Sequence, residues 1–376
     1  MLGRMLAIGL VGLGGGRVML VDEATGEEKW AVQAHSAGGT HQTPQVAMSP
    51  GNGRFVVSVG GNDEHWKLWD AASGELHRVG ATHDGTGACI CVFNNLGRRV
   101  LQEGCPVVAH TAKVTTVAFS PCGQSLATGG WDGAVIIWDV ETGEAHQRMQ
   151  GNVVSALSLS FSGEGAFLAC GNCDGSIHVW DAMDPFGIVL RTIPKVYEYL
   201  VESVEFSPTD SLTLASGGDY HIHLWDIDSG EKIRSFRACT FAAFSQDGRS
   251  IATTNSDPNS DGHSREVHVV DAESGALRLR LFGHLQRVSC ATFSVDDGSK
   301  IASGSNDGAC KVWDSSTGAL LRTINVGTRV TSLSFGRDWM RDLKCSFAMG
   351  HHPRLGTASQ VLELEVGVVR MILDRV

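Results

Sequence analysis

The stretch that decides the fold runs from Val114 to Asp139 and reads VTTVAFSPCGQSLATGGWDGAVIIWD. A hydrophobic segment leads into a Ser-Pro turn, and a short segment rich in Ala, Ser, Thr and Gly follows. A turn containing Asp132 then leads into a β-branched segment that ends in Trp-Asp, and a fourth segment follows the next turn at 145–150. Short apolar runs separated by Gly, Asp, Ser and Pro turns predict an antiparallel four-stranded sheet.

The same unit recurs along the chain. Neighbouring units close about 42 to 48 residues apart, with one interval of 69 residues between Asp70 and Asp139. A fixed period of this size indicates a repeat architecture in which neighbouring units bury a shared core. The residues that close the seven complete units are Asp22, Asp70, Asp139, Asp181, Asp226, Asp271 and Asp314.

The long interval contains an eighth unit that lacks its middle. ACICVFNNLGRRVL, from Ala88 to Leu101, matches a first strand, a turn and the start of a second strand, and QEGCPVVAH, ending at His110, matches the last turn and fourth strand. The unit at about 81–110 therefore lacks its third strand, which we interpret as a skipped exon or gene-model error, with a functional adaptation as the alternative. Because the fourth strand loses its partner, we expect either a distorted region near Ala88–His110 or a seven-membered ring that excludes the remnant.

Composition excludes several classes of protein. The net charge of −11 argues against a general role in binding nucleic acid or anionic membranes, and no apolar run is long enough to span a bilayer. The N-terminal stretch has no cleavage site of a targeting peptide, and its glycines lead directly into a strand, which favours a β-hairpin over a nucleotide-binding loop. The ten cysteines lie mostly in apolar runs, so we expect them to be reduced residues of the core. We therefore expect an intracellular protein, in the cytoplasm rather than the nucleus. The CxxC pair at Cys170 and Cys173 has no second pair, which argues against a zinc or redox site.

These units resemble the WD-repeat β-propeller family. Trp-Asp pairs stand at 69–70, 138–139, 180–181, 225–226 and 313–314, and copies without Trp stand at 20–22 and 269–271. The resemblance covers about residues 5–336 and implies an all-β propeller of seven or eight blades, with seven intact repeats and one truncated one. The chain starts at a second strand, MLAIGLVG, and RVTSLSFG at Arg329–Gly336 is a first strand without a blade of its own. We expect these two segments to pair and close the ring.

The resemblance also implies a hydrogen-bond network around the tryptophan of each blade. A buried indole N–H needs a partner, which Ser or Thr supplies together with His and Asp. Recurrence in successive blades predicts structural networks here and no catalytic triads. The complete sets are His110, Thr128, Asp132 and Trp138, and His284, Ser303, Asp307 and Trp313; Ser216, Asp219 and Trp225 form a set without the His.

No pattern in the sequence predicts catalysis, a cofactor or a metal site. Paired-carboxylate, His-x-x-x-His and nucleophile-elbow signatures are missing, and the adjacent His351 and His352 are more typical of a solvated loop. We therefore expect no enzyme activity. The resemblance implies instead a protein-binding face formed by residues before each first strand and within the turn between second and third strands. These residues are Lys113, Trp131, Asn152, Cys173, Tyr220, Arg287, Asn306 and Arg329.

The function predicted from this pattern is a non-catalytic scaffold that binds other proteins or peptides, alone or as a subunit of a larger complex. Trp131 is either a binding hot spot or a cover for the central channel. The alternative function is a substrate-recognition subunit of a ubiquitin ligase, but the Arg expected two residues after the Asp is absent at Ala72, Glu141, Met183, Asp228 and Ser316.

The tail at 337–376 departs from the repeat. It is strongly apolar and could form an amphipathic helix, extra strands or a docking segment. LEVGVVRMIL faintly resembles an F-box helix, and KCSFAMG could begin a further blade. Because the chain begins in the middle of a blade, it could also be part of a larger protein.

Overall fold

The computed structural model describes thirteen ranges of the chain. They are 5–12, 15–35, 45–50, 53–60, 66–80, 91–93, 99–101, 110–152, 154–184, 186–237, 239–254, 264–295 and 297–336. The predicted boundary of the propeller at 336 coincides with the end of the last range, and the tail and its His351–His352 pair lie outside the described residues.

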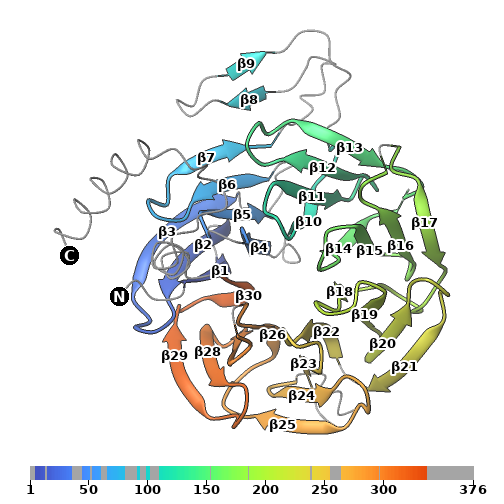
Figure 1. Cartoon of the computed structure of the whole chain (residues 1–376). Helices are drawn as coiled ribbons and strands as arrows, with labels where there is room; N and C mark the ends of the chain where they lie inside the picture. Colours follow the sequence, from blue (N-terminus) through green and yellow to red (C-terminus); the bar gives the residue numbers. More distant parts are fainter. Residues whose placement is uncertain are drawn as a thin grey trace, which may run out of the picture. The chain divides into compact units, whose positions relative to one another are not determined.

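Seven four-stranded antiparallel sheets stand around a central channel as the blades of a propeller (Figure 1). The predicted all-β propeller is therefore confirmed, with seven blades. Three blades are built from β4 (Gln45–Met48), β5 (Phe55–Val59), β6 (Lys67–Asp70) and β7 (Leu76–Val79); from β10 (Val114–Phe119), β11 (Ser125–Gly130), β12 (Val135–Asp139) and β13 (Ala145–Met149); and from β14 (Ala156–Phe161), β15 (Phe167–Asn172), β16 (Ile177–Asp181) and β17 (Val189–Ile193). Three more are built from β18 (Ser203–Phe206), β19 (Thr213–Gly218), β20 (His221–Asp226) and β21 (Lys232–Arg237); from β22 (Cys239–Phe244), β23 (Ser250–Thr254), β24 (Val267–Asp271) and β25 (Leu277–Leu281); and from β26 (Val288–Phe293), β27 (Lys300–Ser305), β28 (Ala309–Asp314) and β29 (Leu320–Asn325).

The seventh blade joins the two ends of the sequence. It consists of β1 (Met5–Gly12), β2 (Gly15–Asp22), β3 (Glu28–His35) and β30 (Arg329–Phe335), in the order β3-β2-β1-β30. β1 pairs antiparallel with β30, and Leu6 lies opposite Phe335. The predicted ring closure is confirmed.

The truncated repeat is not a blade. β8 (Cys91–Phe93) and β9 (Arg99–Leu101) form a two-stranded sheet of their own and belong to none of the seven four-stranded sheets (Figure 1). Of the two outcomes expected from the sequence, the seven-membered ring is the one found. The distortion expected near Ala88–His110 falls largely on 94–98 and 102–109, which lie outside the described residues.

The blades on either side of the remnant pack directly against each other. Trp66 of the β4–β7 blade meets Trp138 of the β10–β13 blade edge to face, with ring centroids 5.7 Å apart, inside one buried hydrophobic cluster. At the rim, the Arg78 guanidinium donates hydrogen bonds to the carbonyl oxygens of Glu141 and Thr142. The ring is thus closed at this point without an eighth blade.

Direct contact across this junction predicts that the remnant is dispensable for stability. Replacing residues 82–108 with a Gly/Ser linker of equal length is expected to leave the melting temperature within about 2 °C. The control replaces an equally long stretch inside a blade, 155–181, which should abolish cooperative melting. Calorimetry measures both, and a large fall in Tm for the first replacement would contradict the prediction.

The turn after each Trp-Asp explains why its sequence recurs. In the β10–β13 blade, the Asp139 carboxylate accepts the N–H of Thr142 at 2.6 Å, and the Gly143 N–H donates to the Asp139 carbonyl at 2.8 Å. Gly143 has φ +74°, a conformation that L side chains rarely adopt. The aspartate and the glycine are therefore both required by the turn itself.

Hydrogen bonds link the first strands of neighbouring blades. The hydroxyls of Ser158 and Ser160 on β14 accept the N–H groups of Val204 and Phe206 on β18, at 2.9 and 3.1 Å. Ser332 and Ser334 on β30 accept those of Val46 and Met48 on β4, at 3.2 and 3.0 Å. Since first strands line the channel, these bonds hold its wall together.

Candidate protein-binding face

Backbone hydrogen bonds bring the predicted face residues together in pairs. The N–H of Trp131, Cys173 and Asn306, each directly after a second strand, donates to a carbonyl just before the first strand of the same blade, at 2.9 to 3.0 Å. The acceptors are Lys113, Ser155 and Arg287. We call the side of the ring that carries these six residues the upper face, and the side that carries the turns after the first and third strands the lower face.

Trp131 is an exposed aromatic side chain on the upper face. Its side chain keeps 51% of its surface accessible, and the Lys113 ammonium lies 4.9 Å from the centroid of its ring. An ammonium over an indole face is an attractive cation–π arrangement. Large, rigid and exposed, Trp131 has the properties of a binding hot spot.

Three predicted residues converge on a pocket at the upper mouth of the channel. Arg287, Asn306 and Arg329 line a cavity of about 190 Å³ together with Glu202, Phe241, Ser289 and Thr331. Within the described ranges, neither guanidinium forms an ion pair or a side-chain hydrogen bond, and the buried Oδ1 of Asn306 has no partner. Trp131 does not line this pocket.

Glu202 is a pocket residue that the sequence analysis missed. Burial raises its pKa, and the positive charge of Arg287 opposes that rise. Glu202 takes the second position of VESVEF, where VTTVAF has Thr115 and VSCATF has Ser289. Those two hydroxyls donate to Gly129 and Gly304 at 3.1 Å, a bond that a carboxylate does not form. An alignment of the first strands could have singled it out.

The other predicted face residues lie elsewhere. Asn152 is buried, and its amide nitrogen donates to the Val154 carbonyl at 3.1 Å, so that Ser155 takes the position equivalent to Lys113. Tyr220 is exposed and has φ +62° directly after Asp219, whose φ is +45°. Neither lines the pocket at the channel mouth.

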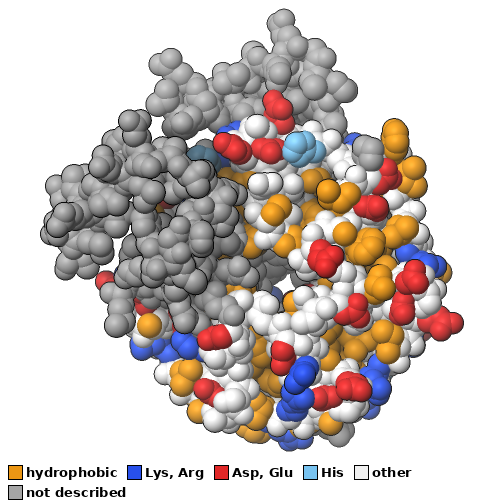
Figure 2. Space-filling model, viewed as in Figure 1, with side chains coloured by type: hydrophobic (Ala, Val, Ile, Leu, Met, Phe, Trp, Pro, Cys, Tyr) orange, Lys and Arg blue, Asp and Glu red, His pale blue; other side chains and the backbone are white. Residues whose placement is uncertain are grey.

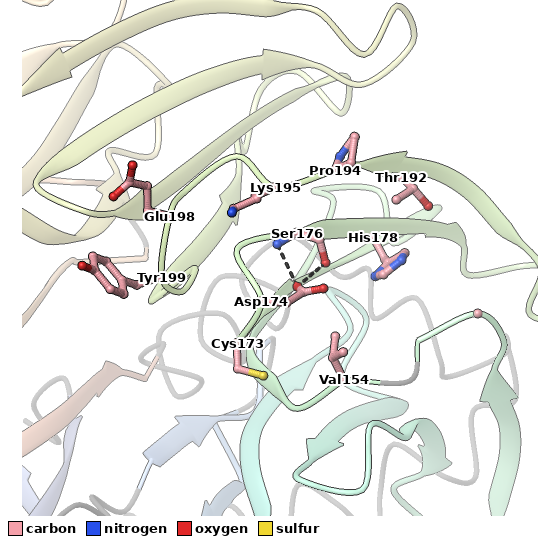
Figure 3. A pocket seen from close by; sticks show the side chains of 11 residues that line it. Val154, Cys173, Asp174, Ser176, His178, Thr192, Pro194, Lys195, Glu198 and Tyr199 are labelled. Carbon is pink, nitrogen blue, oxygen red and sulfur yellow. Dashed lines mark hydrogen bonds between the residues drawn. The ribbon is translucent and has the colours of Figure 1, made fainter.

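Cys173 lines a shallow groove between the β14–β17 and β18–β21 blades (Figure 3). The groove has a volume of about 750 Å³; Asp174 belongs to the turn beside Cys173, and Lys195 and Tyr199 belong to the loop after β17. His178 accompanies them, but its Nδ1 lies 2.8 Å from the Asn172 amide, and burial lowers its pKa. No hydrogen-bonded Cys-His pair forms among these described residues.

The two complete networks are assembled as hydrogen-bonded tetrads. Trp138 donates to the Thr128 hydroxyl at 2.7 Å, which lies 2.8 Å from Nε2 of His110, and Nδ1 of that ring lies 3.0 Å from the Asp132 carboxylate. Although burial acts to raise it, the hydrogen bonds from His110 and the Thr111 N–H hold the pKa of Asp132 below its usual value.

The second tetrad repeats this geometry. Trp313 donates to Ser303 at 2.8 Å, Ser303 lies 2.8 Å from His284, and His284 lies 3.0 Å from Asp307. Burial lowers the pKa of His284, opposed by Asp307. The histidines and aspartates are almost inaccessible, which leaves no room for a substrate.

The sequence analysis missed Tyr197 in the partly predicted set of one blade, and the whole network of another. In the β18–β21 blade, Tyr197 takes the place of His, and its hydroxyl and the Trp225 indole both lie 2.9 Å from the Ser216 hydroxyl. Burial raises the pKa of Tyr197. In the β4–β7 blade, His35 and Trp69 share the Ser58 hydroxyl, both at 2.9 Å.

Comparison with known proteins agrees with the fold. The family model described as "WD domain, G-beta repeat" matches residues 103–139, 142–181, 191–226 and 275–314. The chain is a WD-repeat protein. WD-repeat propellers typically act as scaffolds for protein interactions and are generally not catalytic.

The proteins that are similar to this chain in sequence carry several different names. The chain is 28% identical to the nuclear distribution protein PAC1 of Coccidioides posadasii, over 57% of this chain and 51% of that one. It is 26% identical to the guanine nucleotide-binding protein subunit beta of Zea mays, over 68% of this chain and 59% of that one. The WD repeat-containing protein 1 of Gallus gallus is 25% identical, over 56% and 27%. The chain thus spans about half the length of the first of these relatives.

The described residues contain no helix that is long and apolar enough to cross a membrane. They also contain no group of three His, Cys, Asp or Glu side chains placed to hold a metal ion.

Proposed function

We propose that this WD-repeat protein is a non-catalytic scaffold that binds a partner protein through its upper face. The observation that carries the proposal is the convergence of Arg287, Asn306 and Arg329 at the channel mouth, with polar groups that have no partner among the described residues. Exposed arginines and an exposed tryptophan beside a concave centre are typical of interface hot spots. The proposed compartment is intracellular.

The charges of the pocket indicate the chemistry of the partner. Two guanidinium groups against one carboxyl leave a local excess of positive charge on a chain whose net charge is −11. Arginine pairs well with carboxylates because its donors match their geometry. We propose that the partner inserts an Asp, a Glu or a C-terminal carboxylate here, while Trp131 contacts a neighbouring part of its surface.

Removing both arginines is expected to abolish capture of the partner. Affinity purification with mass spectrometry from the native cell compares the unchanged chain with the Arg287→Ala, Arg329→Ala variant. Because the variant loses two charged hot-spot residues, its affinity for the partner should be at least 30-fold weaker. The control is Arg234→Ala, Arg280→Ala, which removes the same charge from exposed outer-strand positions. Both variants should melt like the unchanged chain.

The captured proteins also distinguish the alternatives. One defined set that is lost only from the Arg287→Ala, Arg329→Ala variant supports binding through the upper face. A set that both variants retain contradicts it and moves the interaction to another surface. A ubiquitin ligase adaptor in the set would support the alternative role of a substrate-recognition subunit.

A further inference from the structure

A second cavity lies at the lower end of the channel. Its volume is about 430 Å³, and its wall comes from the first strands β30, β4, β10, β14 and β18 with two proline turns. Most of the wall is apolar, including Met48, Phe119 and Phe161. The space-filling view shows an opening at the centre of the ring, with hydrophobic and acidic side chains around it (Figure 2). This cavity is distinct from the pocket at the upper mouth.

Glu205 is the one charged residue among the described residues that line this cavity. The pairing register places Glu205 opposite Ala215, as it places Ala118 opposite Ala127. Small residues hold this position in the other six blades. They are Ala47, Ala118, Ser160, Ala243, Thr292 and Ser334.

The structural task at this position does not need a carboxylate. Oε2 of Glu205 accepts the Phe244 N–H of the next blade at 3.1 Å. Ser160 and Ser334 accept the equivalent N–H groups at 3.1 and 3.0 Å with a hydroxyl. Glutamate therefore adds a charge and a second oxygen beyond what the link between blades requires.

No described cation compensates the charge that Glu205 carries when its carboxyl is ionised. Burial raises the pKa of Glu205 to about 8, opposed by the Phe244 N–H, and no cation contributes to the shift. The strands packed against β18 present Ser160, Ala215 and Phe244 beside it, none of which is charged. A carboxylate in an apolar cavity is costly unless it is paired.

We propose that the lower cavity binds a cationic side chain, an arginine or a lysine of a partner chain, with Glu205 as its counter-ion. Both side chains have an aliphatic stem that suits an apolar wall and a charged end that suits a carboxylate. The upper mouth has the opposite charge, so the two ends of the channel select different ligands. This site is independent of the proposed binding through Arg287 and Arg329.

The test uses the purified full chain and three capped peptides, acetyl-Gly-Gly-X-Gly-Gly-amide, in which X is Arg, Lys or citrulline. Citrulline keeps the shape of arginine without its charge. Titration calorimetry should show saturable binding of the Arg or the Lys peptide at millimolar concentrations or below. The peptide that binds more strongly identifies whether the partner inserts an arginine or a lysine. The citrulline peptide should bind at least tenfold more weakly.

Two substitutions separate the charge from the fold. Glu205→Gln keeps the shape, and Glu205→Ser keeps the link to Phe244 in the way that Ser160 does, so at least the serine variant should melt normally. Both should weaken binding at least tenfold, whereas Arg287→Ala, Arg329→Ala should leave it unchanged. Undiminished binding to Glu205→Ser, equal binding of citrulline, or no saturable binding of either cation would overturn the proposal.

The pH dependence of peptide affinity distinguishes a counter-ion from a glutamate that is only structural, because a structural glutamate would leave the affinity independent of pH. The cation binds the ionised carboxyl, so affinity should rise by about 30-fold between pH 6.5 and 9 for a free carboxyl with a pKa of about 8. Arginine stays charged throughout this range. An affinity for the Arg peptide that does not change with pH would contradict the assignment of Glu205.

Discussion

Replacing Trp138 with alanine is expected to lower the free energy of unfolding by about 3–5 kcal/mol. The side chain is 1% exposed and lies in the hydrophobic cluster shared by the blades on either side of the truncated repeat. The change opens a cavity beside Trp66 and removes the indole N–H that donates to Thr128 at 2.7 Å. The effect therefore combines lost burial with a disrupted tetrad.

Chemical denaturation measures this loss, and Trp131→Ala is the matched control. The two tryptophans belong to the same blade, but Trp131 is 51% exposed and its removal should change the free energy of unfolding by about 0.5 kcal/mol or less. Trp138→Phe should fall between them, because it keeps a buried ring and loses the hydrogen bond. Equal losses for Trp138→Ala and Trp131→Ala would contradict the prediction.

The fold was predictable because each repeat carries its own turn chemistry. The Asp139 carboxylate and the positive φ of Gly143 are demands of a local turn, so the sequence displays the same Asp and Gly in six of the seven blades. Ring closure was predictable because β1 and β30 are strands without partners of their own. The fate of the truncated repeat was not, because it depends on whether Trp66 and Trp138 can meet across the junction, a contact between residues far apart in the chain.

The candidate site was predictable only in part. Arg287 and Arg329 hold equivalent positions before first strands, which the repeat reveals, but their convergence with Glu202 and Phe241 depends on the curvature of the ring. Tyr197 escaped prediction because a Tyr hydroxyl replaces a His nitrogen in the same hydrogen bond. The assignment of Asn152 missed the register because the loop before β14 has a different length, and Ser155 takes the expected position.

Replacing Lys300 with methionine is expected to cost about 2–3 kcal/mol, since it leaves a buried carboxylate unpaired. The Lys300 ammonium contacts the carboxylate of Glu23, whose side chain is 3% exposed, whereas Lys300 itself is 28% exposed. Glu23 follows β2 in the closing blade, and Lys300 begins β27 in the preceding blade of the ring. The pair therefore crosses the seam where the two ends of the chain meet.

Lys29→Met is the matched control. Lys29 also pairs with a glutamate, Glu27 at 3.1 Å, but that glutamate is 68% exposed and two residues away. Loss of an exposed pair should cost about 0–0.5 kcal/mol. Adding Glu23→Gln to Lys300→Met should recover most of the stability, because the unpaired charge disappears with it.

The location of the Glu23–Lys300 pair also predicts where the Lys300→Met variant opens. β1 and β30 come from opposite ends of the sequence, so the chain itself does not hold this pair of strands together as it holds the hairpins of the other blades. A destabilised seam should raise hydrogen exchange at the β1 and β30 amides, while the β14–β17 blade on another part of the ring keeps its protection. Uniformly faster exchange would mean that the ring unfolds only as a whole. Faster exchange confined to β1 and β30 would show that the closing blade is the least stable part of the ring and that the buried Glu23–Lys300 pair stabilises it.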